Sequence, residues 1–139
     1  MTDPRGEAMQ PPILDVTSTK STAELGLAVE AAVAAHGFTV LGMHDLGAKL
    51  REKGQAYEGD CRVYDVCNAR QAARVLAERP DVSTALPCRI SVSTDADGKT
   101  HAATILPSSL LGMFDAPALA EVGVEVEQVL AAIIHDAVG

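Results

Sequence analysis

The sequence predicts an α+β fold, a single compact domain in which helices pack on an antiparallel or mixed sheet. Segments with apolar residues at helical spacing alternate along the chain with short segments rich in β-branched residues. Two of the strand-like segments flank an Asp97-Gly98 turn, and a hairpin is antiparallel by construction. A chain of 139 residues fits one domain, and this length buries roughly two thirds of the surface that the unfolded chain exposes.

The first third of the chain predicts a tail, a strand and a helix. Residues 1–12 are polar and end in two prolines, which indicates a flexible tail before a domain spanning residues 13–139. Residues 13–19 predict the first strand. Ser21 and Glu24 have the spacing of a capping box, in which each satisfies a backbone donor near the other. The helix that begins there is expected to end at His36-Gly37, because glycine permits a left-handed cap.

The middle of the chain predicts two strands and two helices. Residues 38–45 are apolar at both parities, so we expect a strand that is covered on both faces or largely buried. A short helix over 46–53 and a strand over 61–66 follow. Asn68, with Gln71 three positions later, is then the expected N-cap of a helix over 69–78, which Pro80 ends.

The last third predicts a hairpin and a long helix. Strands over 88–94 and 99–106 flank the turn, and Pro107 breaks the second of them. Asp115 and Pro117 have the residue types of an N-cap and a first-turn residue. The helix that follows is expected to pack on the sheet through an apolar stripe formed by Leu119, Val122, Val126, Val129, Ile133 and Ala137.

Charge and composition argue against several classes of partner. The formal net charge is −8 without any Lys/Arg cluster, and aromatic residues make up 3% with no Trp, so we expect binding neither to nucleic acid nor to anionic membranes. The first ten residues lack the apolar core of a secretory signal, and no apolar run approaches the roughly 20 residues of a membrane span. We therefore expect a cytoplasmic protein whose three cysteines are reduced.

Cys67 and Cys88 are the candidate site residues, with Asn68 beside the first of them. Cys67 ends a predicted strand and abuts a helix N-terminus, where the helix dipole favours a thiolate with a lowered pKa. Cys88 opens a strand directly after Pro87. If the two strands are neighbours, both thiols face one pocket. The alternative is that each cysteine is a small buried hydrophobe.

The remaining polar residues predict no metal site and no catalytic residue. Two cysteines separated by twenty residues lack the four ligands of structural zinc. His44 with Met43 is a candidate ligand pair for haem or copper only if it reaches Cys67 or Cys88. His101 is expected at the surface, and a hydroxyl of the segment Pro107-Ser108-Ser109 is expected to cap a helix rather than to contact a ligand.

The order of these motifs resembles a known family. Cys67-Asn68, a helical segment to Leu76 and then Leu86-Pro87-Cys88 are similar to the Cys-Asn-Pro…Leu-Pro-Cys pattern of the DUF302 family, over roughly residues 13–136. The resemblance implies a compact α+β domain that often forms homodimers, and it implies no catalytic residues. The chain departs from the pattern at Ala69, where proline usually follows Cys-Asn.

Three functional hypotheses follow. The first is a small-ligand binding or sensing module, thiol-, metal- or haem-dependent, with Cys67, Asn68 and Cys88 at its site. The second is a thiol-based redox or sulfur-transfer enzyme in which Cys67 is the nucleophile and Cys88 resolves; the absence of a base beside the nucleophile argues against it. The third is a structural or interaction domain. In each case we expect a homodimer, and the sequence names no ligand or cofactor.

Overall fold

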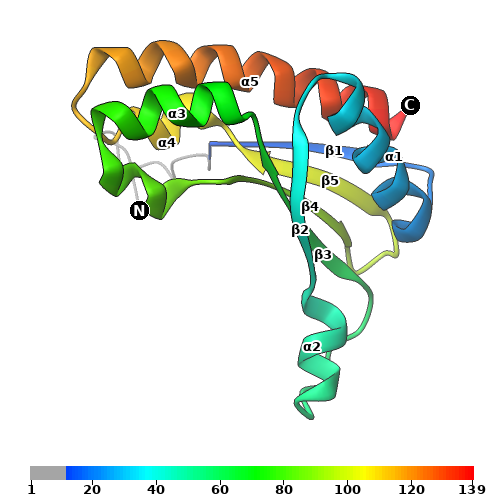
Figure 1. Ribbon diagram of the computed structural model, residues 1–139. Coiled ribbons are helices and arrows are strands. Elements are labelled where there is room, and N and C mark those ends of the chain that lie inside the picture. The colour runs from blue at the N-terminus through cyan, green and yellow to red at the C-terminus, as the bar shows by residue number, and fades with distance from the viewer. Residues whose placement is uncertain (1–11) are drawn as a thin grey trace, which may run out of the picture.

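The computed structural model describes residues 12–139 and has two layers (Figure 1). Five strands form one antiparallel sheet in the order β1-β5-β4-β3-β2. The α+β prediction is therefore confirmed, with a sheet that is antiparallel throughout. The predicted tail lies outside the described residues except for Pro12. The strands are β1 (Ile13–Ser18), β2 (Thr39–Asp45), β3 (Cys61–Cys67), β4 (Cys88–Thr94) and β5 (Thr100–Ile105).

Helices cover one face of this sheet, while α2 projects from the far end of β2 and β3 (Figure 1). The longest helix, α5, runs along the sheet above α3 and α4. None of the helices within residues 12–139 is long and apolar enough to cross a membrane. The helices are α1 (Thr22–Ala35), α2 (Leu46–Glu52), α3 (Ala69–Glu78), the 3-10 helix η1 (Pro80–Ala85), α4 (Pro107–Leu111) and α5 (Pro117–Val138).

The β4–β5 hairpin forms as predicted. The strands pair from Ser91 opposite Ala103 to Thr94 opposite Thr100. Gly98 adopts a φ of 81°, and the Asp95 side chain accepts hydrogen bonds from the amides of Asp97 and Lys99. The turn is therefore closed by one carboxylate and by a glycine in the left-handed region that other residues rarely adopt.

The predicted helix caps are also present. Ser21 Oγ accepts from the Glu24 amide at 3.1 Å, and the Ser21 amide donates to the Glu24 carboxylate at 3.3 Å. Gly37, with a φ of 78°, follows the end of α1. Asn68 Oδ1 accepts from the Gln71 amide at 3.0 Å and starts α3. The two N-caps satisfy backbone donors that the helices leave without a partner, and the amides after α1 donate to its last carbonyls.

The prediction that residues 38–45 are buried is wrong. β2 is an edge strand that pairs only with β3, and Leu41 and Met43 are 61% and 46% exposed. The register shifts between Val40 and Gly42. Because of this irregularity, apolar residues at odd and at even positions lie on the same face of β2. Their sequence pattern therefore resembled that of a strand covered on both faces.

The expected caps of the last two helices differ from those in the structure. Ala116 rather than Asp115 is the N-cap of α5, although Pro117 is its first residue as predicted. Ser108 does not cap a helix; it lies inside α4, which the sequence did not reveal. The amide and hydroxyl of Ser108 both donate to the Glu127 carboxylate of α5. A five-residue helix is too short to show periodicity. Its position is explained by tertiary contacts: the hydrogen bonds to Glu127 and the burial of Pro107 and Leu111.

The core lies between the sheet and α1 and α5. All members of the predicted α5 stripe are buried except Val129, which is half-buried, and the stripe also includes Leu130 and Ile134. The helix therefore packs on the sheet through the expected face. The largest side chains with almost no exposed surface are Leu25, Val29, Val33, Val66, Val75, Val82, Ile90, Val92, Leu119, Leu130, Ile133 and Ile134.

His101 joins three segments on the sheet face that carries no helix. Its Nδ1 lies 2.8 Å from Asp15 Oδ1 on β1, and its Nε2 lies 2.7 Å from Asp95 Oδ2 in the hairpin turn. The expected surface histidine is therefore held by two carboxylates, with its side chain 22% exposed. The contact with Asp95, followed by that with Asp15, raises the pKa of His101, and the hydrogen bond from His101 lowers the pKa of Asp95.

These shifts predict that His101 makes stability depend on pH. Because the folded pKa of His101 is raised, its contribution is complete below the ordinary histidine pKa of about 6.5 and is lost as pH rises through the folded value. Because the folded pKa of Asp95 is lowered, the stabilisation from the Asp95–His101 pair is lost at the acidic end, as pH falls through that pKa. We expect His101→Gln to flatten the stability profile between about pH 5.5 and 8, measured by urea unfolding. Equal profiles for the wild type and His101→Gln would contradict this.

Candidate functional site

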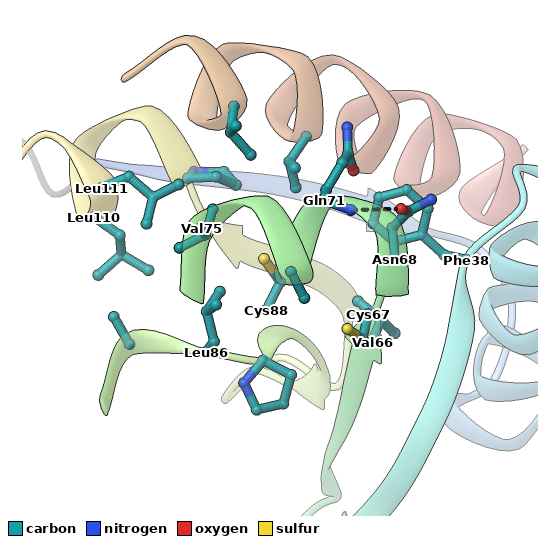
Figure 2. A pocket seen from close by; sticks show the side chains of 16 residues that line it. Phe38, Val66, Cys67, Asn68, Gln71, Val75, Leu86, Cys88, Leu110 and Leu111 are labelled. Atoms are coloured by element: carbon teal, nitrogen blue, oxygen red, sulfur yellow. Dashed lines mark hydrogen bonds between the residues drawn. The ribbon is translucent and has the colours of Figure 1, made fainter. Parts of the chain in front are cut away.

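An apolar cavity lies where the ends of β3 and β4 meet α3, η1, α4 and α5 (Figure 2). It offers about 40 Å³ to water-sized molecules, which is room for a few waters or a single apolar atom such as xenon. Sixteen residues line it, and none is an acid, a base or a histidine within the described chain. They are Phe38, Val66, Cys67, Asn68, Gln71, Ala72, Val75, Ala85, Leu86, Pro87, Cys88, Pro107, Leu110, Leu111, Val122 and Val126.

The structure brings together the three residues that the sequence predicted for the site. β3 and β4 are neighbours, and Val66 pairs directly with Cys88, so Cys67 follows one residue after that pair. Both cysteines and Asn68 line the cavity (Figure 2). The condition that the sequence left open, adjacency of the two strands, is therefore met.

The expectation of a lowered pKa at Cys67 is wrong, because burial raises the pKa of its thiol. The pKa of Cys88 is raised to about 11, chiefly by burial and then by repulsion from the negative charge that Cys67 carries once it is ionised. A helix dipole contributes only about 0.3–1 kcal/mol at a helix end, and Asn68 already accepts from the Gln71 amide there. Loss of hydration among apolar side chains therefore outweighs the dipole, and both cysteines are neutral thiols at pH 7.

Asn68 and Gln71 are the polar side chains at this end of the cavity. Asn68 keeps the turn between β3 and α3 in place through its cap, drawn as a dashed line in Figure 2. Gln71 Nε2 reaches Glu125 of α5 at 3.5 Å, and Glu125 also accepts from Arg74 at 3.0 Å. The sequence identified Gln71 only as a capping position; its side chain instead connects α3 to α5 across the cavity wall.

The apolar wall of the cavity was missed by sequence reasoning. Leu110 and Leu111 come from α4, Leu86 follows η1, and Val122 and Val126 come from α5. These residues belong to three separate segments of the chain. The α5 periodicity placed Val126 in the core, but no local pattern indicates that α4 and η1 close over the same space.

The other candidate ligand, His44, lies away from the cavity, as do His36 and Cys61. His44 does not line the cavity; its Nε2 lies 2.8 Å from Asp65 Oδ2 on the neighbouring strand. His36 contacts Asp136 at 2.6 Å. Cys61 lies at the opposite end of β3 from Cys67. Within residues 12–139, no group of three or more His, Cys, Asp or Glu side chains is placed to hold a metal ion. The proposed route from His44 to a haem or copper ion beside the cysteines therefore has no geometric support.

Two comparisons relate this fold to known proteins. The family model described as "Domain of unknown function DUF302" matches residues 14–137. The chain is also similar to the crystal structure of the uncharacterized conserved protein DUF302 from Bacillus stearothermophilus. The two are 32% identical, with 94% of this chain and 99% of that chain covered and a TM-score of 0.86. No curated protein matches the chain.

Proposed function

The chain belongs to the DUF302 family, and we propose that it is a binding module for a small, uncharged and mostly apolar molecule held in the cavity beside Cys67, Asn68 and Cys88. The observation that carries the proposal is the lining of this cavity. Small-molecule sites are mostly apolar with a few polar groups that fix orientation. Here those groups are two thiols and two amide side chains.

The electrostatics of the lining select an uncharged ligand. The thiols are neutral, and no charged side chain among the lining residues would compensate a ligand charge that loses its hydration. Thioether and thiol sulfurs are polarisable and pack well against apolar and aromatic groups. A compact hydrocarbon-like molecule therefore suits the cavity better than an acid, an amine or a phosphate.

The same observations disfavour the alternative of a thiol enzyme that uses Cys67 as nucleophile. The thiolate is the reactive form of cysteine, and a raised pKa leaves little of it at pH 7. A histidine or carboxylate that would accept the thiol proton is absent from the lining residues of the described chain.

The binding proposal is tested by filling the cavity. Ala72 lines it from α3, whereas its neighbour Ala73 is exposed. We expect xenon, used as a small apolar probe, to shift the backbone NMR signals around Val66, Val75 and Leu111 in the wild type and in Ala73→Leu, and not in Ala72→Leu. At ten times its dissociation constant, xenon should add about 1.4 kcal/mol to the free energy of unfolding. Absence of binding to the wild type, or equal binding to both variants, would refute the proposal.

The thiol assignment makes a separate prediction about reactivity. Because burial raises both pKa values, iodoacetamide should modify Cys67 and Cys88 more slowly at pH 7.5 than it modifies a free thiol of pKa about 8.5. Each rate should rise about tenfold per pH unit, and that of Cys88 should not level off before about pH 11. Mass mapping of the labelled peptides measures this. Rapid labelling of Cys67 at neutral pH would instead restore the nucleophile hypothesis.

A further inference from the structure

A buried acceptor without a partner lies beside the cavity. Three buried side-chain atoms within residues 12–139 make no hydrogen bond, and these are Arg62 Nε, Asp65 Oδ1 and Gln71 Oε1. The first lies 4.0 Å from the carboxylate of Asp45, and the second lies 3.4 Å from the guanidinium of Arg89, so an opposite charge stabilises each. The third belongs to a residue that lines the cavity.

The neighbours of Gln71 fix which way its amide points. Its side chain extends from α3 toward α5 (Figure 2), where Nε2 donates to Glu125 at 3.5 Å and Arg74 donates to the same carboxylate at 3.0 Å. A carboxylate only accepts hydrogen bonds, so turning the amide over would set oxygen against oxygen. Oε1 therefore faces away from Glu125. Because this one contact is long and the last torsion of glutamine is broad, a small rotation brings Oε1 toward the cavity.

The lining of the cavity does not supply the donor that this acceptor needs. Native structures satisfy most buried acceptors with protein groups or with ordered water, because an unpaired one destabilises the fold. Among the described residues, no Ser, Thr, Tyr, Lys, Arg or His lines the cavity, and the two thiols are weak donors. Asn68 also lines it but makes no hydrogen bond to Gln71 Oε1. The donor therefore has to come from a molecule inside the cavity.

An alcohol suits this acceptor better than water does. A buried water typically needs about two to four polar partners, and the lining offers one unused strong acceptor among mostly apolar side chains. An alcohol donates one hydrogen bond through its hydroxyl, and its carbon end packs on Val75, Leu86 and Leu111 instead of seeking further partners. An amine also donates, but it is charged at neutral pH, and no acid lines the cavity within residues 12–139 to compensate that charge.

From these observations we propose that the ligand of the cavity is a small neutral alcohol whose hydroxyl donates to Gln71 Oε1. The inference rests on the proposed binding function, to which it adds the chemical class of the ligand and the residue that selects it. The alcohol has to be compact, because the cavity has room for only a few waters. Methanol takes the space of roughly two waters and carries one hydroxyl, so it is the probe that fits.

Methanol and xenon, each titrated and followed by NMR, test this proposal. In the wild type, methanol should displace xenon and should move the side-chain carbonyl carbon of Gln71 downfield, which xenon should not do. Gln71→Met keeps the length of the side chain and removes the acceptor. Methanol should therefore bind this variant about three- to tenfold more weakly, the range that loss of one neutral hydrogen bond produces. Xenon makes no hydrogen bond, so its affinity should change less than about twofold.

Arg74→Met is the matched control, because Arg74 is exposed and contacts the same Glu125 carboxylate without lining the cavity. Both probes should bind it as they bind the wild type, and an equal loss of methanol affinity there would overturn the assignment to Gln71. If xenon binds but methanol does not, or binds wild type and Gln71→Met equally, or leaves the carbonyl signal in place, the alcohol proposal is wrong and the cavity proposal stands. Absence of xenon binding to the wild type refutes both.

Discussion

Replacing Val126 with Asp is expected to lower the free energy of unfolding by about 3 kcal/mol or more, because the new carboxylate would lie among apolar side chains without a partner. Val126 is 7% exposed, packs on the sheet from α5 and also lines the cavity. The group must either lose most of its hydration while charged or take up a proton at a cost. Both routes destabilise the fold at neutral pH.

The matched control lies two residues earlier on the same helix. Val124 is 49% exposed, so Val124→Asp makes the same chemical change at a position that contacts water. Valine and aspartate have similar helix propensities, so the backbone preference hardly changes at either position. We expect it to change stability by about 0.5 kcal/mol or less. Urea unfolding followed by circular dichroism measures both variants. Equal losses would mean that α5 is not anchored through the face containing Val126.

The Val126→Asp variant also separates packing from charge. If destabilisation arises from the buried carboxylate, the variant regains stability as pH falls and the group takes up its proton in the folded state. Val126→Ala, which removes volume without adding charge, should show no such recovery. A loss that does not depend on pH would assign the effect to packing alone.

Features fixed by neighbouring residues were predictable from the sequence. The Ser21–Glu24 capping box, the Asn68 cap and the Asp95–Gly98 turn each depend on contacts within five residues, and each forms as expected. The long apolar stripe of α5 was equally visible, since twenty-two residues provide many turns over which the period can be recognised.

Features that depend on contacts between distant segments were not predictable. α4 is held by the donation from Ser108 to Glu127, nineteen positions away. Burial of β2 was overestimated because its irregular register mixes the parities that periodicity relies on. Whether a strand lies at the edge of a sheet depends on the order of all the strands. The residue pattern of β2 alone therefore does not predict that it lies at an edge.

The candidate site depends both on local motifs and on contacts between distant segments. Cys67, Asn68 and Cys88 were identified from local motifs, and their convergence required β3 and β4 to pair, which they do. The chemical state of the thiols was predicted wrongly. A helix N-terminus is visible in the sequence, whereas the apolar wall contributed by Leu110, Leu111 and Val126 is not. The helix N-terminus favours a thiolate at Cys67. Burial by residues from distant segments raises the pKa of both thiols, and this effect is larger.

Gly26→Ala is expected to destabilise the protein by about 1–3 kcal/mol, although alanine is normally the better helix former by up to about 1 kcal/mol. Gly26 is buried inside α1, and a Cβ at this position would overlap the hydroxyl of Tyr64 and lie 3.2 Å from its Cζ. Tyr64 is 3% exposed on β3, so its ring cannot move aside without disturbing the core. The close approach of α1 to the sheet therefore requires a residue without a side chain.

A double-mutant cycle identifies the cause of this effect. Tyr64→Phe removes the oxygen nearest to the added methyl group, so the combined variant should recover most of the stability that Gly26→Ala loses. Gly42→Ala on β2, where an added Cβ meets nothing within 4 Å, is the control and should change stability by about 0.5 kcal/mol or less. Thermal and urea unfolding of the four proteins measure the coupling. If Tyr64→Phe gives no recovery, the constraint on Gly26 comes from the helix backbone rather than from its contact with β3.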